Sequence, residues 1–423
     1  MMERYSEYKN SGVYYIPQIP SEWNVLKGKI LFKQEKRPVN KEDEIVTCFR
    51  DGEVTLRKNR RLEGFTNSLK EIGYQGIRKG DLVIHNMDAF AGAIGVSDSD
   101  GKGTPVYAVC TPIREDANQF YYCYLLRFLA KTGFIQSLAK GIRERSTDFR
   151  YGDFKELLLP VPSRAEQDAI VRYLDTATSE IDKAIAMQQK MIDLLNERKQ
   201  IIIQNAVTKG LDENVEMKES GVEWIGRIPK HWEVRRGKFL FRVVNEYSTT
   251  GQEELLTVSD RTGITPRSMK NVNMFMSESL IGYKKCQKGD ICSNIMWMWH
   301  GAVGVTKYNG VISPSYGVYR QIAVNYDNKY LDYMLRLPRL VDVYGICSTG
   351  LTESRLRLYP DDFMNIQFFI PPVEEQKSIV LQIQKQITDI EKSIRNAENL
   401  ITLLQERKQI IINEVVTGKV RVI

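Results

Sequence analysis

Histidine is scarce in this sequence, and the few histidines are not arranged for catalysis or metal binding. The 423 residues include three histidines, His85, His231 and His300, and no two of them lie at metal-ligand spacing. A zinc site or a Ser-His-Asp triad is therefore not expected. The sequence also lacks a G-x-x-x-x-G-K-[ST] phosphate loop and an Asn/Asp-Pro-Pro-aromatic segment of the kind used in amino-methyl transfer. These absences argue against the common classes of catalytic site.

The cysteine pattern and the lack of long apolar runs limit the cellular setting. The six cysteines form no C-x-x-C pair, and scattered cysteines of this kind are typical of proteins of the reducing cytosol. No run of about 18 apolar residues occurs, and residues 1–6 lack the apolar stretch of a signal peptide. We therefore expect a cytoplasmic protein with no membrane contact.

What the sequence does contain is a copy of itself. Three blocks recur at an offset of 209 positions with no net insertion or deletion. A period of this length exceeds that of solenoid repeats, which is about 20 to 50 residues. It indicates duplication of a whole domain together with its connector, and two such units should present two related surfaces. The matching blocks are residues 11–23 with 220–232, 79–96 with 288–305, and 194–203 with 403–412.

Each copy begins with a mixed globular part. In the first copy, two β-type runs within residues 44–56 flank Asp51-Gly52, a strong hairpin signal. The matching stretch, residues 255–267, has Gly263 and Pro266 in its turn region. The Lys-Gly-Asp segment at 79–81 predicts a turn that leads into a buried strand.

Later residues of the globular part predict close backbone packing and a short helix. Gly92 and Gly95 indicate a bulge or a close approach of two backbone segments. Apolar residues at helical spacing predict a helix over residues 120–134. Its counterpart, residues 330–344, is interrupted by Pro338.

A long helix follows each globular part. Pro160 and Pro162 end the first globular part, and residues 163–166 have a capping-box pattern. Beyond them apolar residues recur every three or four positions over five to six heptads, which predicts a coiled-coil seam. The seam residues are Ile170, Leu174, Ala177, Ile181, Ala184, Met191, Leu195 and Ile202, and, in the second copy, Ile379, Ile383, Ile390, Ala397, Leu400, Leu404 and Ile411.

Together these elements predict an α+β fold with approximate two-fold symmetry. Two mixed α/β domains would lie at opposite ends of an antiparallel two-helix coiled coil. The alternative is two unrelated amphipathic helices, each packed on its own globular domain. The expected divisions are a first domain at 1–160, a helical spacer at 161–213, a second domain at 214–369 and a C-terminal helical spacer at 370–423.

One acidic pattern imitates the carboxylate set of a metal-dependent nuclease. Asp361 is followed by Glu375 and Lys377. The first copy keeps Asp153 but has no lysine after Glu166. Because both stretches open a long helix, acidic residues that interact with the helix dipole explain the pattern better than a metal site.

Basic residues gather on predicted loops at corresponding places in both copies. With a net charge of +7, the chain is suited to a nucleic-acid partner, although the same excess serves solubility. Loop cations could contact phosphates or read base edges, or they could be ordinary solvated surface charges. The candidate DNA-binding residues are Arg57, Lys58, Arg60, Arg61, Arg143 and Arg145, and, in the second copy, Arg261, Arg267, Lys284, Lys285, His300 and Arg355.

One short segment differs between the copies although the sequence that follows it is nearly the same in both; we call this common sequence context the shared frame. Residues 88–91 (Asp-Ala-Phe-Ala) and 297–300 (Trp-Met-Trp-His) are both followed by Gly-Ala-Ile/Val-Gly-Val. Different side chains on a common frame are what two readers of different sequences require. Equally, Trp297 and Trp299 could fill a core, while His300 is expected to be exposed.

Over essentially its whole length the chain resembles the specificity subunit of type I restriction-modification systems. The most specific elements are residues 220–232, 371–376 and 403–409, together with their first-copy counterparts. The first copy departs at Tyr14-Tyr15, where the second has Glu223-Trp224, and at Arg164-Ala165, where an acidic residue such as Glu374 would be expected. These departures affect the details of partner contact.

The resemblance implies a function without catalysis by this chain. Each of two target-recognition domains would read one half of a split site in double-stranded DNA, and the helical regions would set the gap between the halves. Helical residues 163–210 and 372–418 would dock two modification subunits, with restriction subunits joining the complex. S-adenosylmethionine, ATP and Mg would bind the partner subunits, and no cofactor is expected here. The candidate partner-binding residues are Glu197, Arg198, Lys199, Glu406, Arg407 and Lys408.

Two other functions compete with this interpretation. A free-standing duplicated nuclease would cleave DNA with magnesium and without partners. A coiled-coil adaptor that binds only proteins would have no salt-dependent affinity for duplex DNA. Since the two copies differ in their variable loops, DNA recognition predicts an asymmetric bipartite site.

Overall fold

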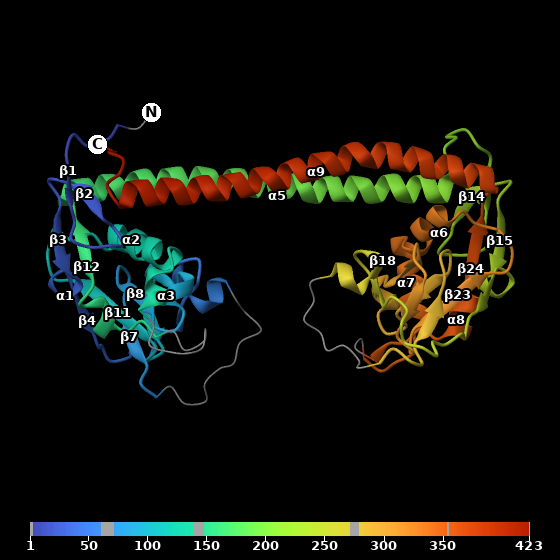
Figure 1. Ribbon diagram of the computed structural model, residues 1–423, viewed down its shortest axis with the longest axis horizontal. Helices are drawn as coiled ribbons and strands as arrows, with labels where there is room; N and C mark the ends of the chain where they lie inside the picture. The colour runs from blue at the N-terminus through green and yellow to red at the C-terminus, as the bar shows by residue number, and fades with distance from the viewer. Residues whose placement is uncertain (1–2, 61–71, 139–147, 271–278, 353–354, 423) are drawn as a thin grey trace. The chain divides into compact units, whose positions relative to one another are not determined.

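The chain folds into two compact units that share both long helices (Figure 1). The computed structural model describes residues 3–60, 72–138, 148–270, 279–352 and 355–422. Unit 1 comprises Met1–Gln189 with Glu398–Ile423, and unit 2 comprises Lys190–Ala397. Helices α5 (Arg164–Lys209) and α9 (Val373–Val416) therefore each contribute one end to unit 1 and the other end to unit 2. Among the described residues, no helix is both long and apolar enough to span a membrane.

The globular part of unit 1 is built on a four-stranded antiparallel sheet of order β4-β11-β8-β9. Two-stranded ladders join β1 to β2, β3 to β12, β5 to β6 and β7 to β10. The elements are β1 (Tyr8–Asn10), β2 (Gln18–Pro20), β3 (Asn24–Lys27), α1 (Gly28–Leu31), β4 (Phe32–Glu35), β5 (Val46–Cys48), β6 (Val54–Leu56), β7 (Gln75–Ile77), β8 (Leu82–His85), β9 (Ile94–Val96), β10 (Gly101–Gly103), β11 (Tyr107–Pro112), α2 (Gln119–Lys131), α3 (Phe134–Ser137), α4 (Tyr151–Phe154) and β12 (Leu158–Val161).

Unit 2 repeats this topology strand for strand. Its four-stranded sheet has the order β16-β23-β20-β21, and the short ladders join β13 to β14, β15 to β24, β17 to β18 and β19 to β22. The elements are β13 (Met217–Glu219), β14 (Arg227–Pro229), β15 (Glu233–Arg236), β16 (Phe241–Val243), β17 (Leu256–Ser259), β18 (Gly263–Pro266), β19 (Lys284–Cys286), β20 (Ile291–Ser293), β21 (Val303–Val305), β22 (Gly310–Ile312), β23 (Gly317–Gln321), α6 (Asn328–Leu335), α7 (Pro338–Cys347), α8 (Pro360–Asn365) and β24 (Gln367–Ile370).

Most local predictions for the globular parts are confirmed. The first hairpin is β5–β6, with Gly52 in the left-handed region at φ 93°. A Cβ on Gly95 would lie 2.0 Å from the carbonyl oxygen of Gly52, so the predicted close backbone approach is real. In unit 2 the helix predicted over 330–344 is split into α6 and α7 at Pro338, which occupies the first turn of α7.

The predicted place of Pro266 is wrong. The turn of the second hairpin lies between β17 and β18, and Pro266 is the last residue of β18, opposite Leu256. The next residue, Arg267, donates its backbone N–H to Leu255 at 2.8 Å and continues the pairing. Since proline has no N–H, the end of a strand is a position that it can occupy without loss of a ladder bond.

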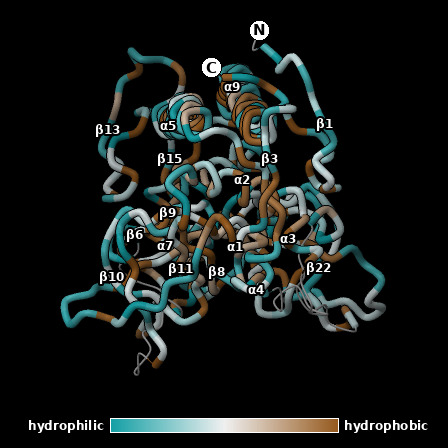
Figure 2. The backbone as a smooth tube through the Cα atoms, turned by 90° about the vertical axis from the view of Figure 1, so that its left-hand side faces the viewer, coloured by the Kyte–Doolittle hydropathy of each residue, from teal (hydrophilic) through white to brown (hydrophobic). Residues whose placement is uncertain are grey.

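The two long helices pack against each other antiparallel, which confirms the coiled-coil prediction (Figure 1). Figure 2 shows α5 and α9 side by side. In unit 1, Lys408 Nζ lies 2.6 Å from Asp182 Oδ2. In unit 2, Lys199 Nζ lies 2.5 Å from Glu391 Oε1. Lys199 and Lys408 are repeat counterparts, and so are Asp182 and Glu391. The same interhelical pair is therefore made twice, once in each unit.

The phase of the predicted seam is wrong at Met191 and Leu400. These side chains are 49% and 42% exposed, whereas Ile192 is 7% exposed. At about 100° per residue, position 191 is turned about 80° away from Ile181, whereas position 192 is turned only about 20°. The observed seam advances in alternate steps of four and three residues through Ile181, Ile185, Gln188 and Ile192.

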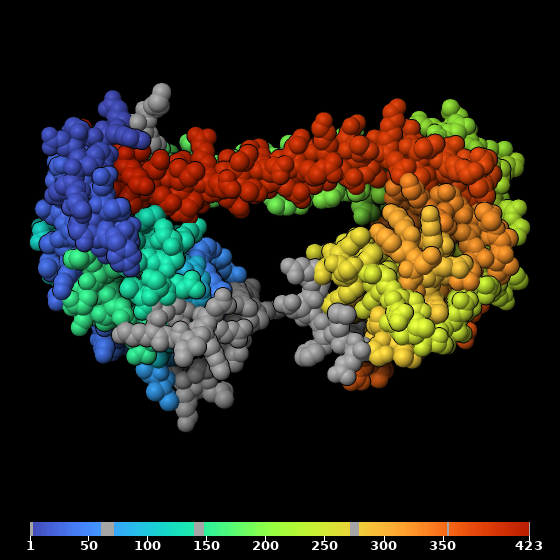
Figure 3. Space-filling view, viewed as in Figure 1, coloured from blue at the N-terminus to red at the C-terminus, as the bar shows by residue number. Residues whose placement is uncertain are grey.

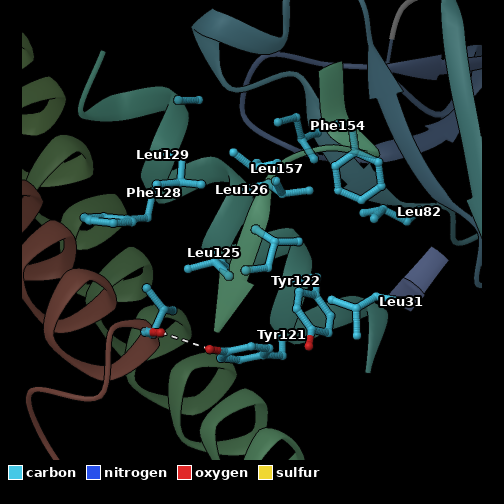
Figure 4. Close-up of a cluster of buried hydrophobic side chains, with 14 of the residues drawn as sticks. Leu31, Leu82, Tyr121, Tyr122, Leu125, Leu126, Phe128, Leu129, Phe154 and Leu157 are labelled. Atoms are coloured by element: carbon cyan, nitrogen blue, oxygen red, sulfur yellow. Dashed lines mark hydrogen bonds between the residues drawn. The ribbon is translucent and has the colours of Figure 1, made fainter. Parts of the chain in front are cut away.

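Each globular core includes the far end of the other copy's helix. In unit 1, Val415 and Val416 of α9 are fully buried in the cluster that contains Trp23. The Tyr121 hydroxyl donates to the Val416 carbonyl at 3.1 Å (Figure 4). In unit 2 the counterpart Tyr330 donates to the Val207 carbonyl of α5 at 2.8 Å.

The chain termini lie together in unit 1. Arg421 donates its backbone N–H to the Glu3 carbonyl at 2.9 Å, and the Tyr8 hydroxyl donates to the Lys419 carbonyl at 3.1 Å. Figure 3 shows the red C-terminal end of α9 packed beside the blue N-terminal segment. The last residues of the second copy thus complete the domain formed by the first.

A buried glutamine ties each long helix to its globular part. Gln167 Nε2 donates to the carbonyls of Asp116 and Pro162, each at 2.9 Å, and its Oε1 accepts from the Asn118 N–H at 2.8 Å. The counterpart Gln376 repeats all three bonds, and both glutamines are fully buried. Gln376 Nε2 donates to the carbonyls of Asn325 and Pro371 at 2.9 and 2.8 Å, and Gln376 Oε1 accepts from the Asp327 N–H at 2.8 Å.

The Gln167→Leu variant should destabilise unit 1. It leaves an N–H and two carbonyls without partners at a buried site, which costs about 3 kcal/mol. Urea unfolding followed by circular dichroism measures the loss. The control is Gln200→Leu on the same helix, at an exposed position, where a change within about 0.5 kcal/mol is expected. Equal stabilities of the two variants would contradict the role given to Gln167.

Candidate nucleic-acid interface

The basic residues after the first hairpin are solvent-accessible and paired with carboxylates of the same region. Lys58 Nζ lies 2.5 Å from Glu44 Oε2. Arg60 Nη1 lies 2.7 Å from Asp51 Oδ2, and the guanidinium stacks on the Phe49 ring at 4.2 Å from the centroid. Exposed ion pairs of this kind contribute only about 0 to 1 kcal/mol, so a phosphate can replace the carboxylate at little cost. The predicted Arg61 lies outside the described residues.

Arg57 holds a more interior position on the same hairpin. It is half-buried, and its Nε donates to Thr47 Oγ1 at 3.4 Å. Its backbone N–H donates to the Ile45 carbonyl at 2.8 Å, which fixes the start of the 3-10 turn Arg57–Asn59. The hairpin therefore orients Arg57, whereas Lys58 and Arg60 project further into solvent.

In unit 2 the candidate cations divide into exposed and tethered ones. Arg261 is exposed in the turn between β17 and β18, and Arg267 is half-buried at the end of β18. Lys285 Nζ lies 3.0 Å from Glu253 Oε1. Lys284 Nζ donates to the Tyr316 carbonyl at 2.8 Å, and burial lowers the pKa of its ammonium group. Lys284 is thus held by the protein itself, and Arg261 is the freer contact for a ligand.

The third group of predicted basic residues is described only in unit 2. Arg143 and Arg145 lie outside the described residues. Arg355 is exposed, and its backbone N–H donates to the Thr352 carbonyl at 2.8 Å. Its side chain is therefore accessible to a ligand.

The segments at 88–91 and 297–300 have the same backbone conformation. Each forms a 3-10 turn, Ala89–Ala91 in unit 1 and Met298–His300 in unit 2, closed by a left-handed glycine. Gly92 has φ 98° and Gly301 has φ 86°. The second residue of each segment, Ala89 or Met298, points inward and is fully buried. The shared frame predicted from the sequence is therefore confirmed.

The exposed side chains on the two frames differ in chemistry. In unit 1, Asp88 pairs with Arg50 at 2.8 Å. In unit 2, Trp297 stacks on Trp299 with centroids 6.1 Å apart and planes at 12°, and on His300 at 5.2 Å and 25°. Unit 1 presents an ion pair where unit 2 presents stacked aromatic rings.

Packing of Trp297 in the core, one of the two interpretations of this segment, is wrong. Its side chain is 53% exposed, and His300 is exposed as expected. A 3-10 turn has three residues per turn, so positions 297 and 300 share a face while Met298 faces the core. Trp299 is half-buried and donates its Nε1 to the Met296 carbonyl at 3.0 Å.

In each unit an ion pair formed by a buried aspartate was not predicted. Asp81 binds Arg37 in unit 1, with Arg37 Nη2 3.1 Å from Asp81 Oδ1. Asp290 binds Arg320 in unit 2, at 2.7 and 2.8 Å. Both aspartates belong to the repeated Lys-Gly-Asp segment, which was the available signal, but Arg37 lies just after β4, whereas Arg320 belongs to β23. These arginines serve the fold and are not free for a ligand.

The nuclease-like acidic residues hold the start of α9 in place. Glu375 accepts from Trp232 Nε1 at 3.1 Å and contacts His231 Nε2 at 2.7 Å. Lys377 Nζ pairs with Glu374 at 2.6 Å. In the first copy the counterpart Glu166 accepts from the Tyr5 hydroxyl. Across the part of the chain that the structure describes, no cluster of three or more His, Cys, Asp or Glu residues could hold a metal ion.

The candidate partner-binding residues of the long helices differ in availability. Glu197, Arg198, Glu406 and Arg407 are exposed. Lys199 and Lys408 instead form the interhelical ion pairs with Glu391 and Asp182. Each helix thus exposes an adjacent acidic and basic side chain at corresponding positions, and partner binding by these residues stays a prediction.

Known proteins with similar sequences support the expected resemblance. No protein-family model matches the chain. A putative type I restriction enzyme MjaX specificity subunit from Methanocaldococcus jannaschii is 22% identical over 96% of each chain. The type I restriction enzyme MjaVIII specificity subunit from the same organism is 24% identical over 72% of this chain and 71% of its own length.

Solved structures with similar folds agree. A chain from a study of complex assembly and conformational transition in the type I restriction-modification system has a TM-score of 0.70 at 15% identity, covering 94% of this chain and 98% of that one. The HsdS subunit from Thermoanaerobacter tengcongensis has a TM-score of 0.51 at 16% identity, covering 95% and 98%. The chain therefore has the fold of these proteins and is similar, over almost its whole length, to specificity subunits of type I restriction-modification systems.

Proposed function

We propose that this chain is the DNA-recognition subunit of a type I restriction-modification complex and is itself not an enzyme. Each globular domain reads one half of an asymmetric bipartite site in double-stranded DNA. The observation that carries this proposal is the pair of 3-10 turns at 88–91 and 297–300, where one backbone frame presents different side chains in the two domains. Two readers of different sequences need this combination of a common scaffold and variable contacts.

The loop cations position the DNA by contacts to phosphates. Lysine and arginine contacts to the backbone fix register but carry little sequence information. The exposed members, Lys58 and Arg60 in unit 1 and Arg261 and Arg355 in unit 2, are the best placed for this role. Because phosphate binding releases counterions, affinity falls steeply as salt rises. A protein-only adaptor would lack this dependence.

The aromatic cluster of unit 2 supplies a base contact. An exposed indole backed by a second ring presents a rigid apolar surface, which can contact thymine methyl groups or wedge between base steps. His300 stacks on Trp297 and lies tilted against Trp299, with ring centroids 4.0 Å apart, and it adds ring nitrogens that can hydrogen-bond to base edges. Asp88 and Arg50 occupy the corresponding surface of unit 1, so the two half-sites should differ.

The long helices set the gap between half-sites and dock two modification subunits. Glu197-Arg198 and Glu406-Arg407 offer the same exposed charge pattern on each helix, which suits two copies of one partner. Restriction subunits join the assembly through those partners. Methylation and cleavage belong to the partner subunits, which carry S-adenosylmethionine, ATP and Mg.

Lengthening both helices should lengthen the gap in the recognised site. The variant duplicates residues 183–189 in α5 and the facing residues 401–407 in α9, so that the heptad phase is kept. It adds about 10.5 Å to the helix pair, at 1.5 Å per residue, and we expect a gap longer by at most about three base pairs. Mapping methylated positions in DNA, for the chain with its modification partner, measures the site.

The wild-type chain should give two different half-sites separated by a fixed gap. Duplication in α5 alone is the control, and it should abolish defined methylation because the seam loses its register. An unchanged gap in the double duplication would refute the spacing role. A palindromic wild-type site, or cleavage by the isolated chain with magnesium, would refute the proposed function.

The Trp297→Ala variant should weaken binding to the mapped site at least tenfold, equivalent to about 1.4 kcal/mol. The loss should be confined to the half-site of unit 2, because Trp297 is a surface residue of that domain alone. Fluorescence anisotropy with duplexes altered in one half-site at a time measures it. Phe239→Ala is the matched control, since Phe239 is an aromatic residue of the same unit with 62% exposure. Equal affinities of the two variants would exclude Trp297 from DNA recognition.

A further inference from the structure

A cationic cavity lies in unit 1 where the globular part meets both long helices. Its volume is about 660 Å³. Arg127 and Lys131 line it from α2, Thr178 and Asp182 from α5, and Lys408 from α9. All of these residues belong to unit 1. Arg50, which pairs with Asp88 on the recognition surface proposed above, also lines the cavity, whereas Arg127 and Lys131 have no part in the recognition and docking contacts proposed above.

Two cations of the cavity, Arg127 and Lys131, form no hydrogen bond or ion pair with the described residues. Asp182 is paired with Lys408, and Asp51, at the cavity edge, is paired with Arg60. Arg127 Nε is buried and has no hydrogen-bond partner. A buried guanidinium nitrogen without an acceptor costs free energy of folding. The Arg127 side chain therefore lacks an acceptor that a ligand could supply.

The local backbone makes room for the Arg127 guanidinium. A Cβ on Gly52 would lie 2.4 Å from Arg127 Cζ, so only glycine at the hairpin turn permits this position. Burial, together with the like charges of Arg127 and Lys408, lowers the pKa of the Lys131 ammonium group. The fold therefore brings like charges together, and an anion would relieve their repulsion.

The second copy shows that this arrangement is not required by the fold. Arg336, the counterpart of Arg127, donates to the carbonyls of Asp260 and Arg261, the latter at 3.1 Å. Lys131 is replaced by the fully buried Leu340, and Thr178 by the buried Ile387. In unit 2 the arginine is thus hydrogen-bonded and the two neighbouring positions are apolar, whereas in unit 1 the Arg127 Nε has no hydrogen-bond partner and a lysine lies nearby.

We propose that the unit 1 cavity binds a phosphate-class oxyanion, held by Arg127 and Lys131. A guanidinium offers a planar fork of donors and an ammonium adds a point charge, and together they match an anion with several oxygens. Thr178 lines the wall beside them. Either a free phosphate compound or a backbone phosphate of DNA has this chemistry.

The first test uses the full chain alone with inorganic pyrophosphate as the probe. Wild type should bind pyrophosphate at least tenfold more tightly than Lys131→Leu, by isothermal titration calorimetry, and only wild type should show a raised melting temperature. Lys131→Leu introduces the residue that unit 2 has at this place, so the fold should tolerate it. Arg127→Gln, which keeps polar groups but removes the charge, should lose binding as well.

The control is Lys183→Leu, which removes an exposed lysine of α5 outside the cavity. It should bind pyrophosphate as wild type does. Equal binding by wild type and Lys131→Leu would overturn the proposal, as would no binding by wild type. Because this test contains no DNA, its result is independent of the proposed recognition function.

A second measurement identifies the source of the anion. With the modification partner and a duplex carrying the mapped site, DNA affinity is measured over a range of salt concentrations. If a DNA phosphate occupies the cavity, Lys131→Leu should reduce the slope of log affinity against log salt by about one, and pyrophosphate should compete with DNA. If the ligand is a free anion, pyrophosphate binds while DNA affinity is unchanged. If Lys131→Leu loses binding to the modification subunit and wild type does not bind pyrophosphate, neither a DNA phosphate nor a free anion is the ligand, and the proposal is wrong.

Discussion

The antiparallel pairing of α5 with α9 is the constraint on which the rest of the structure depends. Because the helices run in opposite directions, the start of one and the end of the other meet in each globular core. Unit 1 buries Ile170 of α5 beside Val416 of α9, and unit 2 buries Ile379 of α9 in the same cluster as Val207 of α5. Each fully buried valine or isoleucine contributes about 1.5 to 3 kcal/mol. Neither domain is therefore complete without residues from both copies of the repeat.

This exchange keeps the scaffold of the two domains alike while leaving their surfaces free to differ. The Gln167 and Gln376 contacts are the same in both copies, as are the hydroxyl bonds of Tyr121 and Tyr330. These residues tie a domain to the helices and cannot vary independently. The side chains at the exposed 3-10 turns carry no such restriction, and there the ion pair of Asp88 contrasts with the aromatic stack of Trp297. Separation of a fixed frame from a variable surface is the physical basis for recognition of two unrelated half-sites.

Periodicity and turn chemistry predicted most of this architecture, and tertiary contacts account for the failures. The hairpin at Asp51-Gly52 and the helix break at Pro338 follow from backbone rules that act over a few residues. The seam prediction fails at Met191 because the adjacent apolar residues Met191 and Ile192 both fit a repeat of three or four residues, and only packing against the partner helix distinguishes them. The sequence around Trp297 is compatible with both a buried and an exposed indole, so it did not predict the exposure of this side chain. The unsatisfied Arg127 became visible only once the hairpin, α2 and the long helices were placed together.

Recognition by two interchangeable readers can be measured directly with a chain that carries the first domain twice. Residues 5–160 would replace residues 214–369, with both long helices kept, and the product would be assembled with the modification partner. Mapping of its methylated sites should give a palindrome, in which the half-site of the first domain occurs twice in inverted orientation across the original gap. Retention of the second, different half-site in that chain would contradict the account.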